Sequence, residues 1–443
     1  MGKRNVPFCM DTYFFLKYFM VKYNWQGRDR HKVQEENMVQ RISIKGLFGY
    51  FDYEIPLWEE RISILTGPNV FGKSTIINCI NAFGNSNLEF FVDLNFKKIE
   101  IFSSDGSKVL CIKKMKDGLK INDEDFPESW IACFSRGMNL NNPYRTSGRM
   151  QDKEHQKKYQ SYIRQMSQVF GNVTLIKEQR LIRHVRRSIV RSSGEERSIG
   201  SEIIETVKEV PYKLVKKMGE IGSEYSRVAN ELDSTYPERL FRQEEKIEES
   251  EFQEKLRLMR ERVGKLNSYG ISDIQELKIK QFRPEDARAL KVYFDDFEKK
   301  YDNYTDLVER LELFVEIINK RFLFKRVEIS SNEGLIIRDK HTEKEIDLLK
   351  LSSGEKETIV LFYNLLFEIS SGEILLIDEP EISLHIAWQR MFINDLIKIE
   401  ELRNLTILVA THSPQMISGN RNIQIDLGEL YKNGLSERKQ DKG

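Results

Sequence analysis

The sequence predicts an α/β fold that is interrupted by a long helical segment, and three observations support this fold class. The β-rich run from Arg61 to Thr66 is followed at once by a glycine-rich turn and by the helical stretch from Ser74 to Phe83. From about residue 201 to 320, apolar residues recur at three- and four-residue spacing with few turn signals, as is typical of helices. After about residue 321, short apolar strands alternate again with helices.

Composition indicates a soluble globular protein. The chain has 443 residues, so roughly two or three folding units are expected. Hydrophobic residues make up 40% and charged residues 31%, which excludes collagen-like and wholly disordered chains. Because 70 Lys and Arg nearly balance 69 Asp and Glu, nucleic-acid binding would require a local basic patch. The 4 cysteines are widely spaced without a CxxC pair, which favours a cytoplasmic location over a disulfide framework or a zinc site.

The first 37 residues show little pattern ahead of the first convincing strand, which begins after Met38. The apolar run from Tyr13 to Tyr23 is interrupted by Lys17, lacks a cleavage site and is too short to span a bilayer, so no membrane partner is expected. Residues 34–37 could be encoded by a ribosome-binding site ahead of Met38. We therefore hypothesise that residues 1–37 are not native; an N-terminal helix docked on the domain is the alternative.

Four segments follow from these patterns: an extension (1–37), an N-terminal lobe (38–200), a helical insertion (201–320) and a C-terminal lobe (321–443). The N-terminal lobe contains predicted strands near residues 99–102 and 109–113. The stretch from about 137 to 170 is polar and predicted to be irregular. A further strand, from Val173 to Ile176, leads into a basic segment, Lys177 to Arg197.

The insertion carries three apolar seams. The first comprises Ile204, Val207, Leu214, Met218, Ile221, Tyr225, Val228 and Leu232. The second comprises Phe252, Leu256, Met259, Val263 and Leu266, and the third Leu290, Phe294, Phe297, Tyr301, Tyr304, Val308, Leu311, Val315 and Ile318. Pro211 is expected to kink or restart the first helix. The seams predict antiparallel helices that form a coiled-coil arm or a compact subdomain; helices packed on the main core are the alternative.

A phosphate-binding loop follows the first α/β strand. The motif G-x-x-x-x-G-K-[ST] is matched by Gly67, Pro68, Asn69, Val70, Phe71, Gly72, Lys73, Ser74 and Thr75. Backbone N–H groups of such a loop cradle phosphates, while Lys73 supplies positive charge and Ser74 a hydroxyl for Mg²⁺. Val70 stands where related loops often have glycine, which predicts a local difference in backbone geometry.

Two carboxylates end a buried strand in the C-terminal lobe. The apolar run from Glu373 to Ile377 is followed by Asp378 and Glu379, the arrangement that a Mg²⁺ ligand and a water-polarising base require at a sheet edge. Upstream, the Leu351 to Lys356 stretch reads as a helix N-terminus with capping serines. Downstream, another strand ends at His412, which by itself would more often be structural.

The order of these four elements resembles that of ATP-binding-cassette (ABC) ATPases, in the branch with the SMC, RecF-type and OLD-type proteins. The resemblance implies an ABC-ATPase nucleotide-binding fold that uses ATP and Mg²⁺. It implies that Ser352, Ser353, Gly354 and Glu355 of one subunit close over ATP held by another, which requires at least a dimer. It also implies that residues 381–385 face the dimer partner and that His412 contacts the γ-phosphate. Gln179 best matches the family's glutamine that senses metal and attacking water.

The stretches 304–353, 379–388 and 410–415 look like the single-chain ATPases of bacterial antiphage defence operons, and are similar to the ATPase components of PARIS and Septu. This resemblance implies an oligomer that controls a separately encoded nuclease or toxin effector. Only 31 residues follow His412, too few for the nuclease domain of OLD-type proteins, so we expect a partner to perform any cleavage.

Three alternatives remain open on sequence grounds. A transporter ATPase is disfavoured by the long insertion. A DNA-repair or end-binding ATPase would use the basic residues Lys177, Arg180, Arg183, His184, Arg186, Arg187, Arg191 and Arg197, which could equally form a solvated or subunit-contacting face. A nucleotide-gated scaffold would bind ATP with negligible turnover.

Three aromatic residues near the phosphate loop in the sequence could contact the base of ATP. Tyr50, Phe51 or Tyr53 could stack on adenine, although ordinary strand packing is the more common role.

Overall fold

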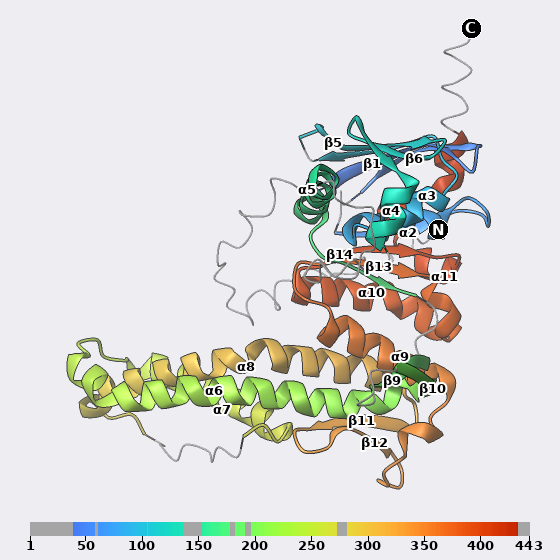
Figure 1. The fold of residues 1–443 in the computed structure, drawn as a ribbon. Helices are drawn as coiled ribbons and strands as arrows, with labels where there is room; N and C mark the ends of the chain where they lie inside the picture. The colour runs from blue at the N-terminus through green and yellow to red at the C-terminus, as the bar shows by residue number, and fades with distance from the viewer. Residues whose placement is uncertain are drawn as a thin grey trace, which may run out of the picture.

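The computed structural model describes residues 39–57, 61–103, 105–135, 153–177, 182–190, 196–272 and 281–432. These residues form two stacked sheets with flanking helices and a long helical arm that projects to one side (Figure 1). The proposed extension 1–37, the predicted start Met38 and the predicted metal sensor Gln179 lie outside the described residues.

The central sheet is parallel and has the strand order β15–β3–β14–β13–β8. Its strands are β3 (Ile62–Thr66), β8 (Val173–Ile176), β13 (Ile374–Asp378), β14 (Thr406–Ala410) and β15 (Gln424–Asp426). Both faces are buried: along β13, Leu375 and Ile377 lie in one hydrophobic core, whereas Ile374 and Leu376 lie in the other. This two-sided burial explains why the central strands β13 and β14 appear in the sequence as nearly continuous apolar runs.

A second sheet is antiparallel, and α2 (Lys73–Gly84) lies between it and the central sheet (Figure 1). In the order β2–β1–β4–β5–β6–β7, it comprises β1 (Val39–Leu47), β2 (Phe51–Pro56), β4 (Lys98–Ser103), β5 (Lys108–Met115), β6 (Gly118–Ile121) and β7 (Glu124–Pro127). The strands predicted at 99–102 and 109–113 are thereby confirmed as β4 and β5. Two short helices, α3 (Leu88–Asp93) and α4 (Glu128–Ser135), lie against this sheet at β6 and β7.

The expectation of irregular structure up to residue 170 is wrong for its last part, which forms α5 (Lys153–Phe170). Tyr162, Met166 and Phe170 are buried at four-residue spacing, and the ring of Phe170 stacks on Phe83 with centroids 5.6 Å apart. This apolar stripe on an otherwise polar helix is a signal that could have located α5.

The basic segment leads into a β-hairpin, because β9 (Ile182–Val190) pairs antiparallel with β10 (Glu196–Glu205). The expectation that the first helical seam begins at Ile204 is therefore wrong: Ile204 lies in β10, Val207 lies in η2 (Thr206–Lys208), and the helix begins at Glu209. Pro211 restarts rather than kinks the helix. It occupies the first turn, where the missing N–H is tolerated because no intrahelical acceptor exists for it.

The arm consists of α6 (Glu209–Arg242), α7 (Glu249–Ser268), the short η3 (Pro284–Asp286) and α8 (Ala287–Arg321). At its base, Leu214, Met218 and Tyr304 join the core of the C-terminal lobe. At its far end, α7 and α8 bury a separate cluster that includes Phe252 and Phe294. The arm therefore combines both sequence interpretations, with a base packed on the main core and a distal core of its own.

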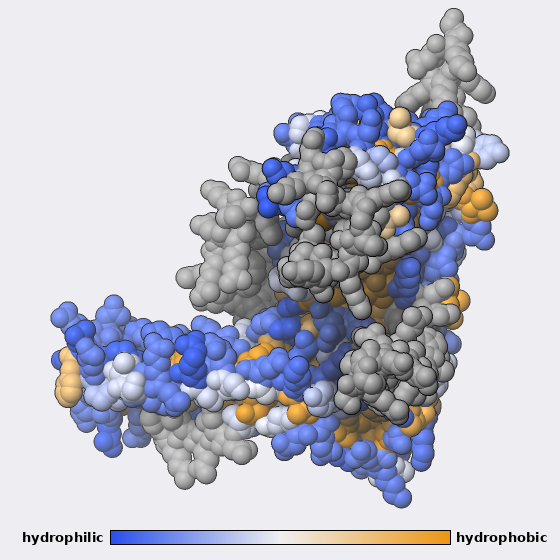
Figure 2. All heavy atoms as spheres, viewed as in Figure 1, coloured by the Kyte–Doolittle hydropathy of each residue, from blue (hydrophilic) through white to orange (hydrophobic). Residues whose placement is uncertain are grey.

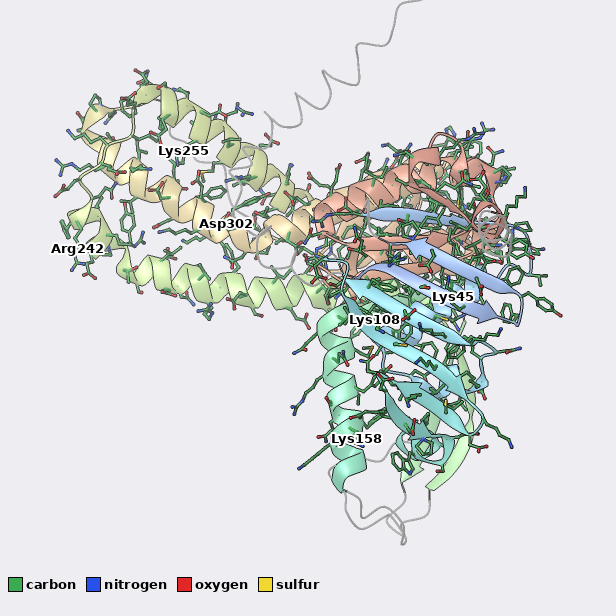
Figure 3. The ribbon with its side chains drawn as sticks, turned by 90° about the horizontal axis from the view of Figure 1, so that it is seen from above. Lys45, Lys108, Lys158, Arg242, Lys255 and Asp302 are labelled. Atoms are coloured by element: carbon green, nitrogen blue, oxygen red, sulfur yellow. The ribbon has the colours of Figure 1, made fainter. Side chains whose placement is uncertain are left out.

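Polar contacts hold the arm's outer surface together. Figure 3 shows the arm reaching away from the sheets, with Lys255 on α7 facing α8. Lys255 Nζ lies 3.4 Å from Asp295 Oδ1 and 3.2 Å from Glu298 Oε1. The visible surface of the arm is mostly hydrophilic, in keeping with seams that face inward (Figure 2).

Most other elements of the C-terminal lobe, which also supplies β13, β14 and β15, lie on the other face of the central sheet. This lobe contains β11 (Lys325–Ser330), β12 (Gly334–Asp339), η4 (Leu348–Lys350), α9 (Ser353–Tyr363), the π-helix η5 (Asn364–Glu368), η6 (Pro380–Ser383), α10 (Ile386–Arg403), α11 (Pro414–Ile417) and η7 (Arg421–Ile423). No helix in the described part of the chain is long and apolar enough to cross a membrane.

Candidate nucleotide site

The phosphate-binding motif forms a loop between β3 and the first turn of α2. Gly67 and Gly72 have positive φ values of 145° and 89°, and Gly72 is the N-cap of α2. Val70 also has a positive φ, 76°, and its side chain is 83% exposed. The loop thus has a glycine-like backbone at Val70, at the cost of strain that a β-branched residue rarely tolerates.

Lys73 is buried beneath this loop, with only 5% of its surface exposed. Its Nζ donates to the carbonyl oxygens of Gly67 at 2.9 Å and Pro68 at 3.4 Å, and lies 3.3 Å from His412 Nδ1. Burial lowers the pKa of Lys73, although Glu379, Glu381 and Asp378 oppose that shift. A buried ammonium group in this position is suited to phosphate oxygens, which would replace the carbonyl acceptors.

The predicted metal ligands Ser74 and Asp378 contact each other, since Ser74 Oγ donates to Asp378 Oδ1 at 3.1 Å. Asp378 ends β13 and is aligned with Ala410 at the end of the adjacent parallel strand, β14. The same sheet edge receives the phosphate loop because β14 also pairs with β3. A hydroxyl and a carboxylate so close together, beside the phosphate loop, fit the oxygen ligands that Mg²⁺ prefers.

Glu379 and His412 meet at this edge. Glu379 has a left-handed backbone, with φ of 47°, and its N–H donates to Ala410 O at 2.9 Å. Its Oε1 lies 3.6 Å from His412 Nε2, and the two side chains are 31% and 34% exposed. The partly open carboxylate can reach a water molecule, while the strained backbone is typical of residues held in place for function.

The described structure therefore brings together Lys73, Ser74, Asp378, Glu379 and His412. It adds a residue whose side chain the sequence analysis gave no role: Glu381 accepts the backbone N–H of His412 at 2.5 Å. The sequence resemblance places Glu381 only in the segment expected to face a dimer partner. Its position three residues after Asp378 was a usable signal for a further carboxylate at this edge.

The residues expected to close over ATP of another subunit, Ser352 to Glu355, form the N-terminus of α9. Ser352 is its N-cap and forms a capping box with Glu355, as the capping serines predicted. Lys325, the first residue of β11, contacts both carboxylate oxygens of Glu355 at 2.8 and 2.7 Å. Desolvation opposes ionisation, but the bonds from Lys325 and Ser352 hold the pKa of Glu355 below its usual value. Ser352 and Ser353 are exposed, and none of the hydrogen bonds of the described residues joins this helix end to the phosphate loop.

The aromatic residues beside the loop pack mainly on one another. Phe51 stacks on Tyr53 with centroids 5.6 Å apart, and its ring lies 5.2 Å from Phe71 and 5.3 Å from Tyr431. Tyr53 donates its hydroxyl to Phe71 O at 2.9 Å. Tyr50, by contrast, is 74% exposed. Strand packing is thus the role of Phe51 and Tyr53 in this structure, and Tyr50 is the ring that is free to stack.

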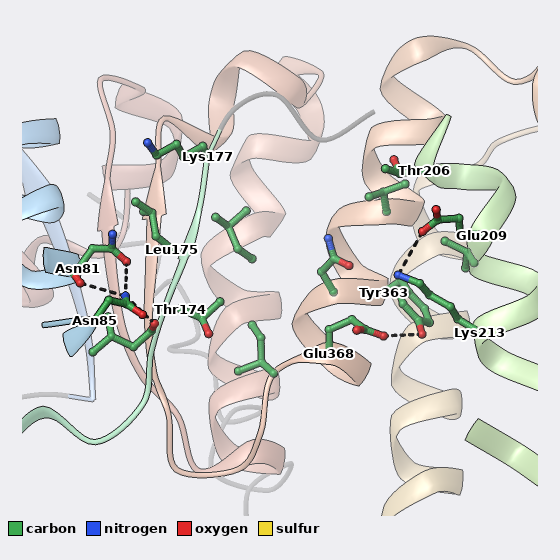
Figure 4. Close-up of a pocket in the computed structure, with 16 residues that line it drawn as sticks. Asn81, Asn85, Thr174, Leu175, Lys177, Thr206, Glu209, Lys213, Tyr363 and Glu368 are labelled. Carbon is green, nitrogen blue, oxygen red and sulfur yellow. Dashed lines mark hydrogen bonds and ion pairs between the residues drawn. The ribbon is translucent and has the colours of Figure 1, made fainter. Parts of the chain in front are cut away.

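A separate cavity of about 730 Å³ lies between the edge strand β8, the base of α6 and the π-helix η5 (Figure 4). Glu209 Oε2 lies 3.4 Å from Lys213 Nζ, and the Tyr363 hydroxyl donates to Glu368 Oε1 at 2.7 Å. No residue of the phosphate loop lines it. Lys177, at the end of β8, lines its rim, two positions before Gln179.

Comparison with solved structures finds SMC head domains. One is the SMC head domain with an extended coiled coil bound to the C-terminal domain of ScpA, from Pyrococcus furiosus, at 12% identity, with 86% of this chain and 91% of that chain covered and a TM-score of 0.38. Another is the SMC head domain from Thermotoga maritima, at 12% identity, the same coverage and a TM-score of 0.35. A search of curated proteins finds no match.

A family model described as the AAA ATPase domain matches residues 38–417, which include the phosphate loop, α9, the acidic strand end and His412. The predicted α/β fold with an inserted helical region is also the fold observed. The chain therefore belongs to the AAA ATPase domain family.

Proposed function

We propose that this protein binds MgATP at the phosphate loop and hydrolyses it to ADP and phosphate. The observation that carries the proposal is the convergence of three distant segments at one sheet edge. Lys73 and Ser74 come from the phosphate loop, Asp378 and Glu379 from β13, and His412 from the end of β14. A buried lysine, a serine–aspartate pair and a partly exposed glutamate at the same edge are the groups that phosphoryl transfer from MgATP requires.

Each residue has a distinct task in this proposal. The N–H groups at the start of α2 and the ammonium of Lys73 bind the phosphates, and Lys73 exchanges its carbonyl acceptors for phosphate oxygens. Ser74 and Asp378 hold Mg²⁺, which supplies charge neutralisation. Glu379 orients and deprotonates the attacking water, and His412 contacts the γ-phosphate. Gln179 remains a proposed sensor of metal and water.

We further propose a homodimer that holds ATP between the phosphate loop of one subunit and Ser352 to Glu355 of another. The exposed N-terminus of α9 supports this arrangement, because a helix N-terminus attracts an anion and none of its described hydrogen bonds reaches the loop of its own chain. Segment 381–385 would then face the partner, and Ile382 in it is 59% exposed.

The biological role that we propose is that of an ATP-dependent sensor or scaffold in the cytoplasm, which controls a separately encoded nuclease or toxin effector in bacterial antiphage defence. The resemblance of segments 304–353, 379–388 and 410–415 to defence ATPases supports it. An SMC- or RecF-like DNA-binding ATPase is the second candidate. It is favoured by the hairpin β9–β10, whose strands include most of the basic segment.

One experiment separates these roles. Tagged protein is purified with its native operon neighbours, and the mass of the complex is measured in ATP and in ADP. A stoichiometric effector that is retained or released according to the nucleotide supports the sensor role. A dimer without partners that binds DNA ends, with an affinity that falls steeply as salt rises, supports the second candidate.

A further inference from the structure

Glu381 joins two loops that both end at the candidate nucleotide site. It lies in η6, directly after the acidic pair, and its Oε1 accepts the backbone N–H of His412 at 2.5 Å. The bond is charge-assisted because a carboxylate accepts it, and such bonds are stronger than neutral ones. The backbone of His412 is thereby fixed to the segment that follows β13.

A second contact holds the same two segments together. Ser413, the neighbour of His412, donates its hydroxyl to Gln389 Oε1 at 2.6 Å. The amide nitrogen of Gln389 in turn donates to Glu381 O at 3.3 Å and to Leu384 O at 3.0 Å. Gln389 therefore holds the backbone of Glu381, while the side chain of Glu381 holds the backbone of His412.

The other carboxylate oxygen of Glu381, Oε2, is buried and has no hydrogen-bond partner among the described residues. The carboxylate is close enough to Lys73 to oppose the lowering of that residue's pKa. Burying an unpaired carboxylate oxygen is costly, so a residue with no task at this site would rarely be a glutamate.

The ring of His412 depends on this anchor. Its Nδ1 lies 3.3 Å from Lys73 Nζ, and its Nε2 lies 3.6 Å from Glu379 Oε1. A protonated lysine can only donate, so this network assigns Nδ1 as the acceptor and leaves the ring proton on Nε2. A shift of the His412 backbone would disturb both contacts at once.

We propose that Glu381 is a positioning residue that fixes His412 between Lys73 and Glu379 through the His412 backbone N–H. This inference rests on the proposed ATPase function. Because Glu381 bonds to the His412 backbone and has no hydrogen bond to the phosphate loop among the described residues, its loss lowers the rate of hydrolysis far more than it changes nucleotide affinity.

The test compares Glu381→Ala with Glu381→Gln, because glutamine keeps a carbonyl oxygen that can accept the His412 N–H. Glu381→Ala should lower kcat by roughly 10- to 100-fold, as the loss of one bond to a charged group implies, with KM for ATP within about threefold of wild type. Glu381→Gln should recover most of that loss. Glu401→Ala, at an exposed position on α10, is the matched control.

A second readout does not require turnover. In the imidazole NMR spectrum, the His412 signal is assigned by its absence from His412→Gln, and it should move in Glu381→Ala but stay close to wild type in Glu381→Gln. Equal kcat losses in both variants would show that the charge of Glu381 matters rather than its hydrogen bond to the His412 backbone, and would overturn the inference. An unmoved His412 signal in Glu381→Ala would also overturn it. If wild type itself does not hydrolyse ATP but the His412 signal moves as expected, the proposed function fails and the positioning role stands.

Discussion

Lys73 of the phosphate loop and His412 at the end of β14 contact each other directly, with Nζ 3.3 Å from Nδ1, although they lie 339 positions apart in the sequence. The contact exists because β3, β14 and β13 are adjacent parallel strands whose C-terminal ends meet at one edge. Residues that are distant in the chain thus form one site.

Replacing Lys73 with alanine should abolish ATP binding. The ammonium is the buried positive charge of the loop, and its removal leaves Asp378, Glu379 and Glu381 to repel the phosphates. We expect the dissociation constant for ATP, measured by calorimetry, to rise at least about 100-fold. Lys108→Ala, at a half-exposed position on the antiparallel sheet, is the control and should bind ATP normally. Tight binding by Lys73→Ala would contradict the assignment of the site.

The capping box of α9 should make stability depend on pH. The folded-state pKa of Glu355 lies below its usual value, so the ionised form stabilises the fold above the unfolded-state pKa, and that stabilisation is lost as pH falls through the folded-state pKa. At pH 7, Glu355→Gln should lower the free energy of unfolding by about 1–2 kcal/mol. In urea titrations the difference should shrink below about pH 4.5. A difference that stays constant from pH 7 to pH 3 would rule out this account.

A buried ion pair joins the arm to α10. Arg321 at the end of α8 contacts Asp395, and their side chains are 0% and 6% exposed. Burial raises the pKa of Asp395 despite the neighbouring guanidinium, which indicates a large desolvation cost.

Breaking this pair on one side should therefore be costly. Asp395→Leu leaves Arg321 buried and uncompensated, and should lower the free energy of unfolding by about 3–5 kcal/mol. The double variant Arg321→Met/Asp395→Leu should recover most of this loss. The exposed pair Lys216–Glu220 serves as the control. In a double-mutant cycle, its coupling free energy should stay below about 1 kcal/mol. The single variant Arg321→Met completes the cycle for the buried pair. If the loss of unfolding free energy in the double variant equals the sum of the losses in Arg321→Met and Asp395→Leu, the two residues are not coupled.

Val70→Gly should not destabilise the protein. The left-handed φ of 76° at Val70 strains a β-branched residue by about 1–2 kcal/mol, which exceeds or equals the entropy cost of about 0.5–1 kcal/mol that glycine adds. Thermal unfolding should show a midpoint equal to or above that of wild type, whereas Val70→Ala keeps a Cβ and gains less. A clearly lower midpoint for Val70→Gly would mean that the exposed side chain stabilises the loop in another way.

The sequence located the motif-bearing parts of the site because each motif is local: a strand, a turn and a helix, or a strand followed by acids. It missed α5, whose buried Tyr162, Met166 and Phe170 are diluted by polar neighbours. It also placed Ile204 in a helix, since spacing alone does not distinguish the end of β10 from the start of α6.

Glu381 shows a different limit. The sequence shows a third carboxylate after β13, but it does not show that this carboxylate accepts the backbone N–H of His412, which lies 31 positions away. Only the pairing of β13 with β14 fixes that distance. The same applies to Lys325 and Glu355, whose side chains are in contact although they lie 30 positions apart in the sequence.

Trapping the ATP-bound state tests the central claim most directly. In Glu379→Gln, the nucleotide and Mg²⁺ sites remain intact while the base is lost. Mass measurement of this variant in MgATP should show a persistent dimer with ATP bound, whereas wild type should dimerise transiently and release phosphate. Equal dimer lifetimes in the two proteins, without phosphate release by wild type, would contradict hydrolysis at this site and favour a nucleotide-gated scaffold.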